Sequence, residues 1–133
     1  MNPPTTANHV VEIVSPVDFQ ATVGRLVDAM RSAGLLLIAQ FDHTAGAKVA
    51  GLEMPPTLVL VYGHPRGGTP VMQASPIAAL DLPLRVLVRE DSLTRTVVAF
   101  HPVVEMLATL GVTEEMARRL EPAQQLIRHA LGQ

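Results

Sequence analysis

The sequence predicts an α+β fold, a two-layer α/β domain in which helices pack on one mixed, largely antiparallel sheet. Three observations support this prediction. Short runs rich in valine, leucine and isoleucine alternate with segments of helical periodicity through the first half of the chain. Two further apolar runs flank a short polar turn, as in a β-hairpin. Helical segments then return, so the expected order is βαβαβ-loop-ββαα.

The first elements follow from apolar runs and capping residues. Residues 1–8 are polar and are expected to form a disordered tail, with residues 9–133 forming a single domain. Residues 9–14 (HVVEIV) are predicted to form a strand. Ser15 and Pro16 are expected to start a helix, as N-cap and first helical residue, and Gly34 to end it.

The middle of the chain contains the remaining strands. Residues 35–41 (LLLIAQF) form the second, after which Asp42 is expected to cap a short helix that Gly51 closes. Residues 57–62 (TLVLVY) form the third. A helical turn or two is expected within residues 70–79, and residues 84–90 and 95–100 form the hairpin.

Two helices are predicted to complete the domain. One begins at Pro102 and ends before Gly111, and Thr113 caps the other. Pro122 lies inside the second helix and is expected to kink or split it near Glu121. Proline has no backbone N–H and its ring clashes with the preceding turn.

Composition narrows the classes of function. The net charge is −2 and aromatic residues make up 3% of the chain, so no nucleic-acid partner is expected. No cysteine is present, which excludes disulfides and thiolate metal sites. Neither a signal peptide nor a membrane-spanning stretch is recognisable, so we expect a cytoplasmic protein without membrane contact. Hydrophobic residues make up 48% of the chain, which favours burial of apolar surface in a homodimer.

The densest set of conformationally restricted residues is the segment 62–87, which is rich in glycine and proline. Within it, Gly67 and Gly68 can adopt positive φ, so their N–H groups could converge on an anion, with Thr69 adding a hydroxyl and Arg66 a charge. The simpler interpretation is that the glycines turn the chain and Thr69 caps a helix. No nucleotide-binding fingerprint is present.

Histidines and carboxylates suggest two weaker alternatives. His43, His64 and His101 each follow a strand and could share a metal with Asp42 or Asp81, but loop histidines are more commonly caps or surface residues, and we expect no metal and no cofactor. A hydrolase or isomerase could use Asp42, His43 and Asp81 if the three meet at one point.

Alternation in residues 84–90 places Arg85, Leu87 and Arg89 on one face of the strand and the three apolar residues between them on the other. The apolar set is expected to face the helices. The arginines are then solvated, lie at a subunit interface or line a cleft.

Three ordered stretches resemble a known family: FDH followed by GLEMPPT at residues 41–57, YGHP followed by GTPVM at residues 62–72, and LDLPLRVLV at residues 80–88. They are similar to the uncharacterised bacterial and archaeal domain of unknown function 302, over residues 10–110. The resemblance implies a compact α/β domain, often paired, with no known activity. Asp42, His43, Thr69 and Asp81 match the shared pattern, whereas the family often has asparagine at the position of His64.

Together these observations predict a homodimeric domain that binds a small ligand, with an anion as the favoured class. The candidate binding residues are Asp42, His43, Arg66, Gly67, Gly68, Thr69, Asp81 and Arg85. The alternatives are a ligand-free subunit-interaction module, with the glycine-proline segment and residues 84–90 at the interface, and the small enzyme named above. Whether the chain is an enzyme stays open at this point.

Overall fold

A computed structural model describes residues 9–133, so the tail expected at residues 1–8 lies outside the described residues. Five strands form one sheet in the order β1-β5-β4-β3-β2, and every pairing between them is antiparallel. The predicted α+β class and the packing of helices on a sheet are confirmed. The sheet is not mixed, because these five strands include no parallel pair.

The bounds of the strands agree closely with the apolar runs. The strands are β1 (Val11–Val14), β2 (Leu36–Asp42), β3 (Thr57–Gly63), β4 (Leu84–Glu90) and β5 (Thr96–Phe100). The strand β2 carries one extra residue, because Leu37 pairs with Tyr62 and Ala39 with Val61, which leaves Ile38 in a β-bulge. Such bulges bend a strand and re-aim a side chain.

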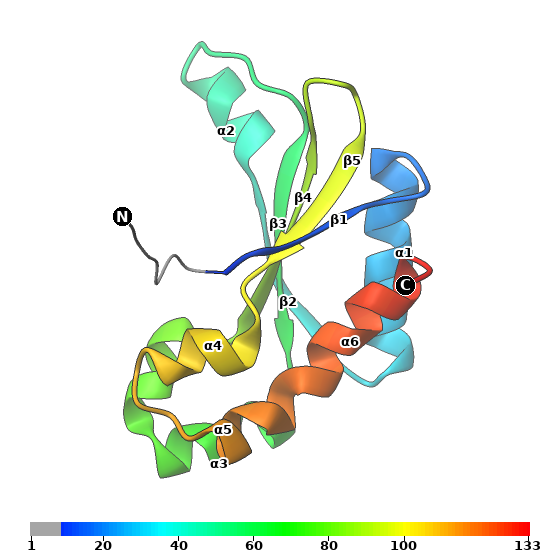
Figure 1. The fold of residues 1–133 in the computed structure, drawn as a ribbon. Helices are drawn as coiled ribbons and strands as arrows, with labels where there is room; N and C mark the ends of the chain where they lie inside the picture. Colours follow the sequence, from blue (N-terminus) through cyan, green and yellow to red (C-terminus); the bar gives the residue numbers. More distant parts are fainter. Residues whose placement is uncertain (1–8) are drawn as a thin grey trace, which may run out of the picture.

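Helical segments are more numerous than the sequence predicts. They are α1 (Phe19–Ser32), α2 (His43–Val49), α3 (Pro65–Ala74), α4 (Val103–Ala108), α5 (Glu114–Ala117) and α6 (Glu121–Ala130), with two 3-10 helices, η1 (Pro76–Asp81) and η2 (Arg118–Leu120). Figure 1 shows α3, α4 and α5 gathered at one end of the sheet and α2 at the opposite end. The helices α1 and α6 pack against each other.

The ends of the helices test the capping predictions. Gly34, Gly51 and Gly111 all adopt positive φ just after a helix, as predicted. The start of α1 was placed too early, because its N-cap is Asp18, whose carboxylate accepts a hydrogen bond from Ala21 N at 2.8 Å. Ser15 still belongs to the sheet edge, since its N–H donates to the carbonyl of Thr96 at 2.8 Å.

The C-terminal helices follow the prediction. Thr113 caps α5, accepting a hydrogen bond from Met116 N at 3.3 Å. The helix then narrows to η2 and restarts as α6, with Pro122 in the first turn of the new helix. Proline is favourable there because the first turn has no use for its missing N–H. The split expected near Glu121 is therefore confirmed.

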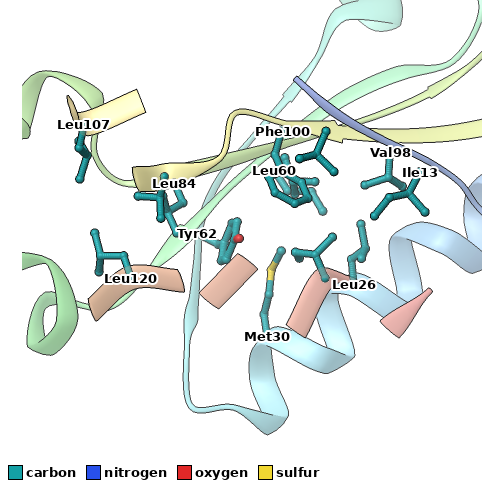
Figure 2. Packing of buried hydrophobic residues seen from close by; sticks show 14 of the residues in the cluster. Ile13, Leu26, Met30, Leu60, Tyr62, Leu84, Val98, Phe100, Leu107 and Leu120 are labelled. Carbon is teal, nitrogen blue, oxygen red and sulfur yellow. The ribbon is translucent and has the colours of Figure 1, made fainter. Parts of the chain in front are cut away.

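The core lies between one face of the sheet and the helices. Leu60, Val86 and Val98 from the sheet are fully buried, as are Leu26 and Met30 from α1. Figure 2 shows Leu60 and Val98 of the sheet facing Leu26 and Met30 of α1, with Tyr62 between Leu84 and Leu60. The core contains few aromatic rings and is mostly aliphatic, as the composition predicts.

The other face of the sheet lies outside this core. Arg85 and Leu87 alternate with buried Leu84, Val86 and Val88, as predicted. Cross-strand pairing extends this outer face over all five strands. Its residues are Glu12, Val14, Ala39, Phe41, Thr57, Val59, Val61, Arg85, Leu87, Arg89, Val97 and Ala99, none of which is part of the core cluster. Val61, Val97 and Ala99 are nevertheless buried.

Across residues 9–133, every helix is too short or too polar to cross a lipid bilayer.

Candidate functional site

A cleft of about 710 Å³ lies where the end of β3, the start of β2 and the helices at that end of the sheet meet. Four segments that are distant in the sequence form its walls. They are the end of β3 with α3, the connection into β4, the turn after α1 with the bulge of β2, and η2 with the start of α6. The volume lies within the range that holds small organic ligands.

The glycine-proline segment is helical from Pro65 onward, whereas the sequence predicted a loop there and a helical turn or two only within residues 70–79. The helix α3 begins at Pro65, and the carbonyl of His64 accepts hydrogen bonds from Gly67 N at 3.0 Å and from Gly68 N at 3.1 Å. Neither glycine has positive φ. The predicted cradle of converging N–H groups is therefore wrong, since these donors are already used inside the helix.

The cap of α3 explains why two glycines can be helical. His64 is the N-cap, and its Nδ1 accepts a hydrogen bond from Arg66 N at 3.0 Å, which leaves the proton on Nε2. Val71 on the other side of the helix is fully buried. Capping and burial together offset the low helix propensity of glycine.

Tyr62 forms the floor of the cleft. Its side chain is 1% exposed, and its hydroxyl donates a hydrogen bond to the carbonyl of Ala123 at 2.7 Å. This bond ties the end of β3 to the start of α6. Burial raises the pKa of the Tyr62 phenol above its ordinary value of about 10.

The raised pKa predicts a loss of stability at alkaline pH. The unfolded chain releases the phenolic proton near pH 10, whereas the folded chain retains it at higher pH. The contribution of the protonated Tyr62 phenol to the free energy of unfolding is therefore fully present below about pH 10, and it decreases as the pH rises further. Tyr62 is the only tyrosine in a chain without tryptophan, so tyrosinate absorbance reports on this residue alone.

The measurement is the free energy of unfolding across alkaline pH, together with tyrosinate absorbance. Tyr62→Phe is the control, and it should reduce the alkaline decrease in stability. A native protein that forms tyrosinate near pH 10 while it stays folded would contradict a buried phenol.

Two arginines lie at one rim of the cleft. Arg66 precedes Gly67 on α3, and Arg119 precedes Leu120 on η2. These two segments touch: a Cβ placed on Gly67 would lie 3.6 Å from Cδ2 of Leu120. Within residues 9–133 neither guanidinium forms an ion pair, and no aspartate or glutamate lines the cleft.

The neighbouring arginine behaves differently. Arg118 binds Glu114 at 2.8 Å and Glu121 at 3.0 Å, and it does not line the cleft. Arg119 also has an acidic residue, Glu115, four positions before it. The tighter turn of η2 after α5 changes the angle between successive side chains. Within residues 9–133, Arg118 forms ion pairs and Arg119 does not.

The remaining walls of the cleft are mostly apolar. Ile38, exposed by 50%, is the bulged residue of β2 and lines the cleft. Leu35, Met72, Leu82, Leu120 and Leu126 come from the other segments around it. The charged side chains of the lining come from α3 and η2, which also contribute Met72 and Leu120, and this part is called the charged end of the cleft. The turn after α1, the bulge of β2 and the start of α6 contribute no charged side chain, and this part is called the apolar end.

The predicted site residues divide between the two ends of the sheet. Arg66, Gly67, Gly68 and Thr69 line the cleft. Asp42 and His43 lie at the opposite end, because β2 runs antiparallel to β3 and pairs Asp42 with Leu58. There they border a separate hollow of about 560 Å³, with Gln40, Phe41, Gly46, Ala47 and Met54.

The small enzyme considered above is therefore not assembled. Asp42 caps α2, accepting a hydrogen bond from Ala45 N at 2.9 Å, as predicted, and so has a structural role. Asp81 is the last residue of η1 and lies at the end of the sheet where the cleft is, but it lines neither hollow. The length of the strands therefore lies between Asp81 and the pair Asp42 and His43. The three side chains cannot act on one substrate atom.

The same topology bears on the metal site suggested for three histidines and on the place of Arg85. His64 and His101 follow β3 and β5 at one end of the sheet, whereas His43 lies at the other. Within residues 9–133 no cluster of three His, Asp or Glu residues could hold a metal ion. Arg85 lies on the outer face, paired across strands with Val61, and so does not line the cleft.

Sequence reasoning missed the far wall of the cleft. Tyr62, Arg119 and Leu126 are the most important residues that it did not propose. Arg119 lies in η2 and Leu126 in α6, and nothing in the local sequence marks either of them as a site residue. The contact between α3 and η2 joins segments about fifty residues apart, which only the fold brings together.

Sequence comparison finds curated relatives that are much longer than this chain. The chain is 39% identical over 82 residues to the fluoride-specific ion channel FluC 1 of Brucella suis biovar 1 (strain 1330), which covers 62% of the chain and 32% of that protein. The fluoride-specific ion channel FluC 1 of Brucella abortus biovar 1 (strain 9-941) matches with the same identity over 30% of its length. The chain thus spans about a third of these relatives.

A solved structure shares the fold. The crystal structure of an uncharacterized conserved protein DUF302 from Bacillus stearothermophilus superposes with a TM-score of 0.80, covering 92% of this chain and 95% of that one, at 14% identity. The family model described as domain of unknown function DUF302 matches residues 11–133, more than the resemblance at the sequence level suggested. The chain therefore belongs to the DUF302 family.

Proposed function

We propose that this domain binds a small organic anion in the cleft beneath α3. The observation that carries the proposal is the pairing of two arginines, free of acidic partners within residues 9–133, with a mostly apolar cleft. Arginine binds carboxylates and phosphates through parallel hydrogen bonds. The predicted ligand class is thus kept, but the donors are guanidinium groups in place of the loop N–H groups.

The remaining polar groups of the cleft support a binding role. The Nδ1 of His64 and the hydroxyl of Tyr62 are both used in hydrogen bonds within the protein. Thr69 and the Nε2 of His64 add further donors to the residues that line the cleft. None of these groups forms a nucleophile–base pair, so the arrangement favours binding over catalysis.

The relatives are compatible with this proposal. Proteins named as fluoride-specific ion channels contain a segment similar to this chain in about a third of their length. A ligand-binding domain is a part that can be joined to another function in one chain. The channel activity itself belongs to the longer proteins. The cytoplasmic location and the lack of a cofactor stay predictions.

The test is isothermal titration of the protein with benzoate and octanoate. We expect binding to the wild type, and a loss of about tenfold or more in affinity for Arg119→Gln, because a charge-assisted hydrogen bond contributes about 1.5–3 kcal/mol. Arg118→Gln is the matched control and should bind as the wild type does. Equal affinity of the Arg119→Gln variant and the wild type would contradict a guanidinium contact.

We also propose that the domain is a homodimer, through the outer face of the sheet. That face is largely apolar, with Phe41 exposed by 55% and Val14 by 51%. Five strands spaced by about 4.8 Å, each roughly 20 Å long at about 3.4 Å per residue, give a face of about 500 Å² per copy. Two copies packed face to face would bury about 1,000 Å², the lower limit for a specific interface.

This interface differs from the one that the sequence suggested. The strand β4 contributes Arg85, Leu87 and Arg89, but α3 lies at the cleft and takes no part. Leu87→Arg should convert a dimer to a monomer in light scattering, whereas Leu93→Arg at the tip of the hairpin, 68% exposed, should not. A wild type that is monomeric at micromolar concentration would exclude the dimer.

A further inference from the structure

We infer that the ligand of the cleft is an amphiphile, with an anionic head between Arg66 and Arg119 and a hydrocarbon body along the apolar walls. This inference rests on the proposed function and names the class of ligand. It follows from how charge and apolar surface are distributed within the cleft.

The head group is placed by the contact between α3 and η2. Gly67 and Leu120 approach each other at 3.6 Å, counted from a Cβ built on the glycine, and each is preceded by one of the two arginines. Both arginines line the cleft, each one residue before this contact, and both are exposed. Positive charges that line one cleft repel each other, and a bound anion offsets that repulsion. One carboxylate or phosphate at this rim satisfies both.

The body of the ligand is placed by the other segments. From the turn after α1, the bulge of β2 and the start of α6, the lining includes Leu35, Ile38, Ala123 and Leu126 but no charged side chain. The hydroxyl of Tyr62, which could have bound a polar substituent here, is already donated to Ala123. A sugar acid or a polar dicarboxylate would bury unpaired hydroxyl or carboxylate groups at this end, at a cost in free energy.

The bulge adds a specific indication. Regular pairing of β2 with β3 needs no residue between Leu37 and Ala39, yet Ile38 is inserted there and lines the cleft. Its side chain is half exposed, so an apolar ligand that covered it would remove that surface from water. Ile38 is thus the residue of β2 that has no partner in β3 and lines the cleft.

The experiment titrates the full chain with two series of straight-chain ligands, alkanoates and alkyl phosphates, from four carbons upward. We expect the affinity to rise about fourfold per added methylene until the cleft is filled, because each buried methylene contributes a constant free energy. The series with the higher affinity identifies the head group. Alcohols of the same length should bind about tenfold more weakly, since they lack the charge.

Matched variants separate the body from the head. Ile38→Thr should reduce affinity for octanoate by about tenfold and change that for butanoate little, because only the longer chain reaches the bulge. Ile77→Thr is the control, since Ile77 is 53% exposed on η1 and does not line the cleft. Folding is checked by thermal unfolding of both variants.

The outcomes distinguish the amphiphilic ligand from the anion site on which it rests. Short and long anions that bind equally well, or an Ile38→Thr variant that retains the full length dependence, would overturn the amphiphile and leave an anion site. Failure of every carboxylate and phosphate to bind would overturn the proposed function itself.

Discussion

Replacing Tyr62 by alanine is expected to lower the free energy of unfolding by about 3–5 kcal/mol, the cost of removing a large buried aromatic side chain from a core. Tyr62 is 1% exposed and is the only aromatic residue among the fully buried side chains of residues 9–133. Its ring lies between the Leu84–Leu120 part of the core and the Met30–Leu60 part (Figure 2). A cavity there would separate the two parts, and neither can close it without moving the sheet. Chemical denaturation of the variant and the wild type measures the difference.

The conservative variant Tyr62→Phe divides this effect into two terms. It keeps the ring and removes the hydrogen bond to the carbonyl of Ala123, so we expect a loss of about 1 kcal/mol. If Tyr62→Ala were no more destabilising than Tyr62→Phe, the ring would not be the central packing unit of the core.

Replacing Gln124 by leucine is the second change with a large expected effect, about 2–4 kcal/mol. The side chain is 7% exposed, and it accepts a hydrogen bond from Val103 N at 2.9 Å and donates one to the carbonyl of His101 at 2.8 Å. Leucine has a similar volume but leaves the N–H of buried Val103 without a partner, which costs about 1–3 kcal/mol. It also removes the partly buried hydrogen bond to the carbonyl of His101.

Gln125→Leu is the matched control for this prediction. Gln125 is the next residue of α6 and is exposed. Its replacement should change the free energy of unfolding by less than about 0.5 kcal/mol, since glutamine and leucine have similar helix propensities. Equal effects of the two substitutions, measured by denaturation under the same conditions, would show that the bonds of Gln124 do not stabilise the fold.

The strands and most helix ends could be predicted because their signals are local. Apolar runs fix the five strands to within one or two residues, and glycine marks the ends of three helices. The proline at position 122 predicts where the last helix divides. In each of these cases the residues that carry the signal also form the element, so no knowledge of the rest of the fold is needed.

The helix α3 could not be predicted in the same way. Two glycines and two prolines within residues 65–70 are typical of a loop, and the propensities alone would not give a helix. What decides the outcome is the burial of Val71 and the cap formed by His64, both of which depend on the surrounding structure. Tertiary packing here outweighs local preference.

The candidate site shows the same limit. Of the proposed residues, those in the stretch 66–69 do line the cleft, because they directly follow the strand β3, whose end forms part of it. Asp42 and His43 also follow a strand, but antiparallel pairing sends alternate strands to opposite ends of the sheet. Because the sequence does not give the direction of β2, it could not show whether residues 66–69 or the pair Asp42 and His43 belong to the cleft.

The unpaired position of Ile38 has a consequence for how this sheet can change. The residues before and after it, Leu37 and Ala39, already occupy consecutive rungs of the ladder with Tyr62 and Val61. Shortening the chain by this one residue would therefore leave the alternation of every other side chain on β2 intact, where a deletion in a regular strand inverts all that follows. Related chains could lose or gain a residue here, and so remodel what they recognise, without altering the architecture that supports it.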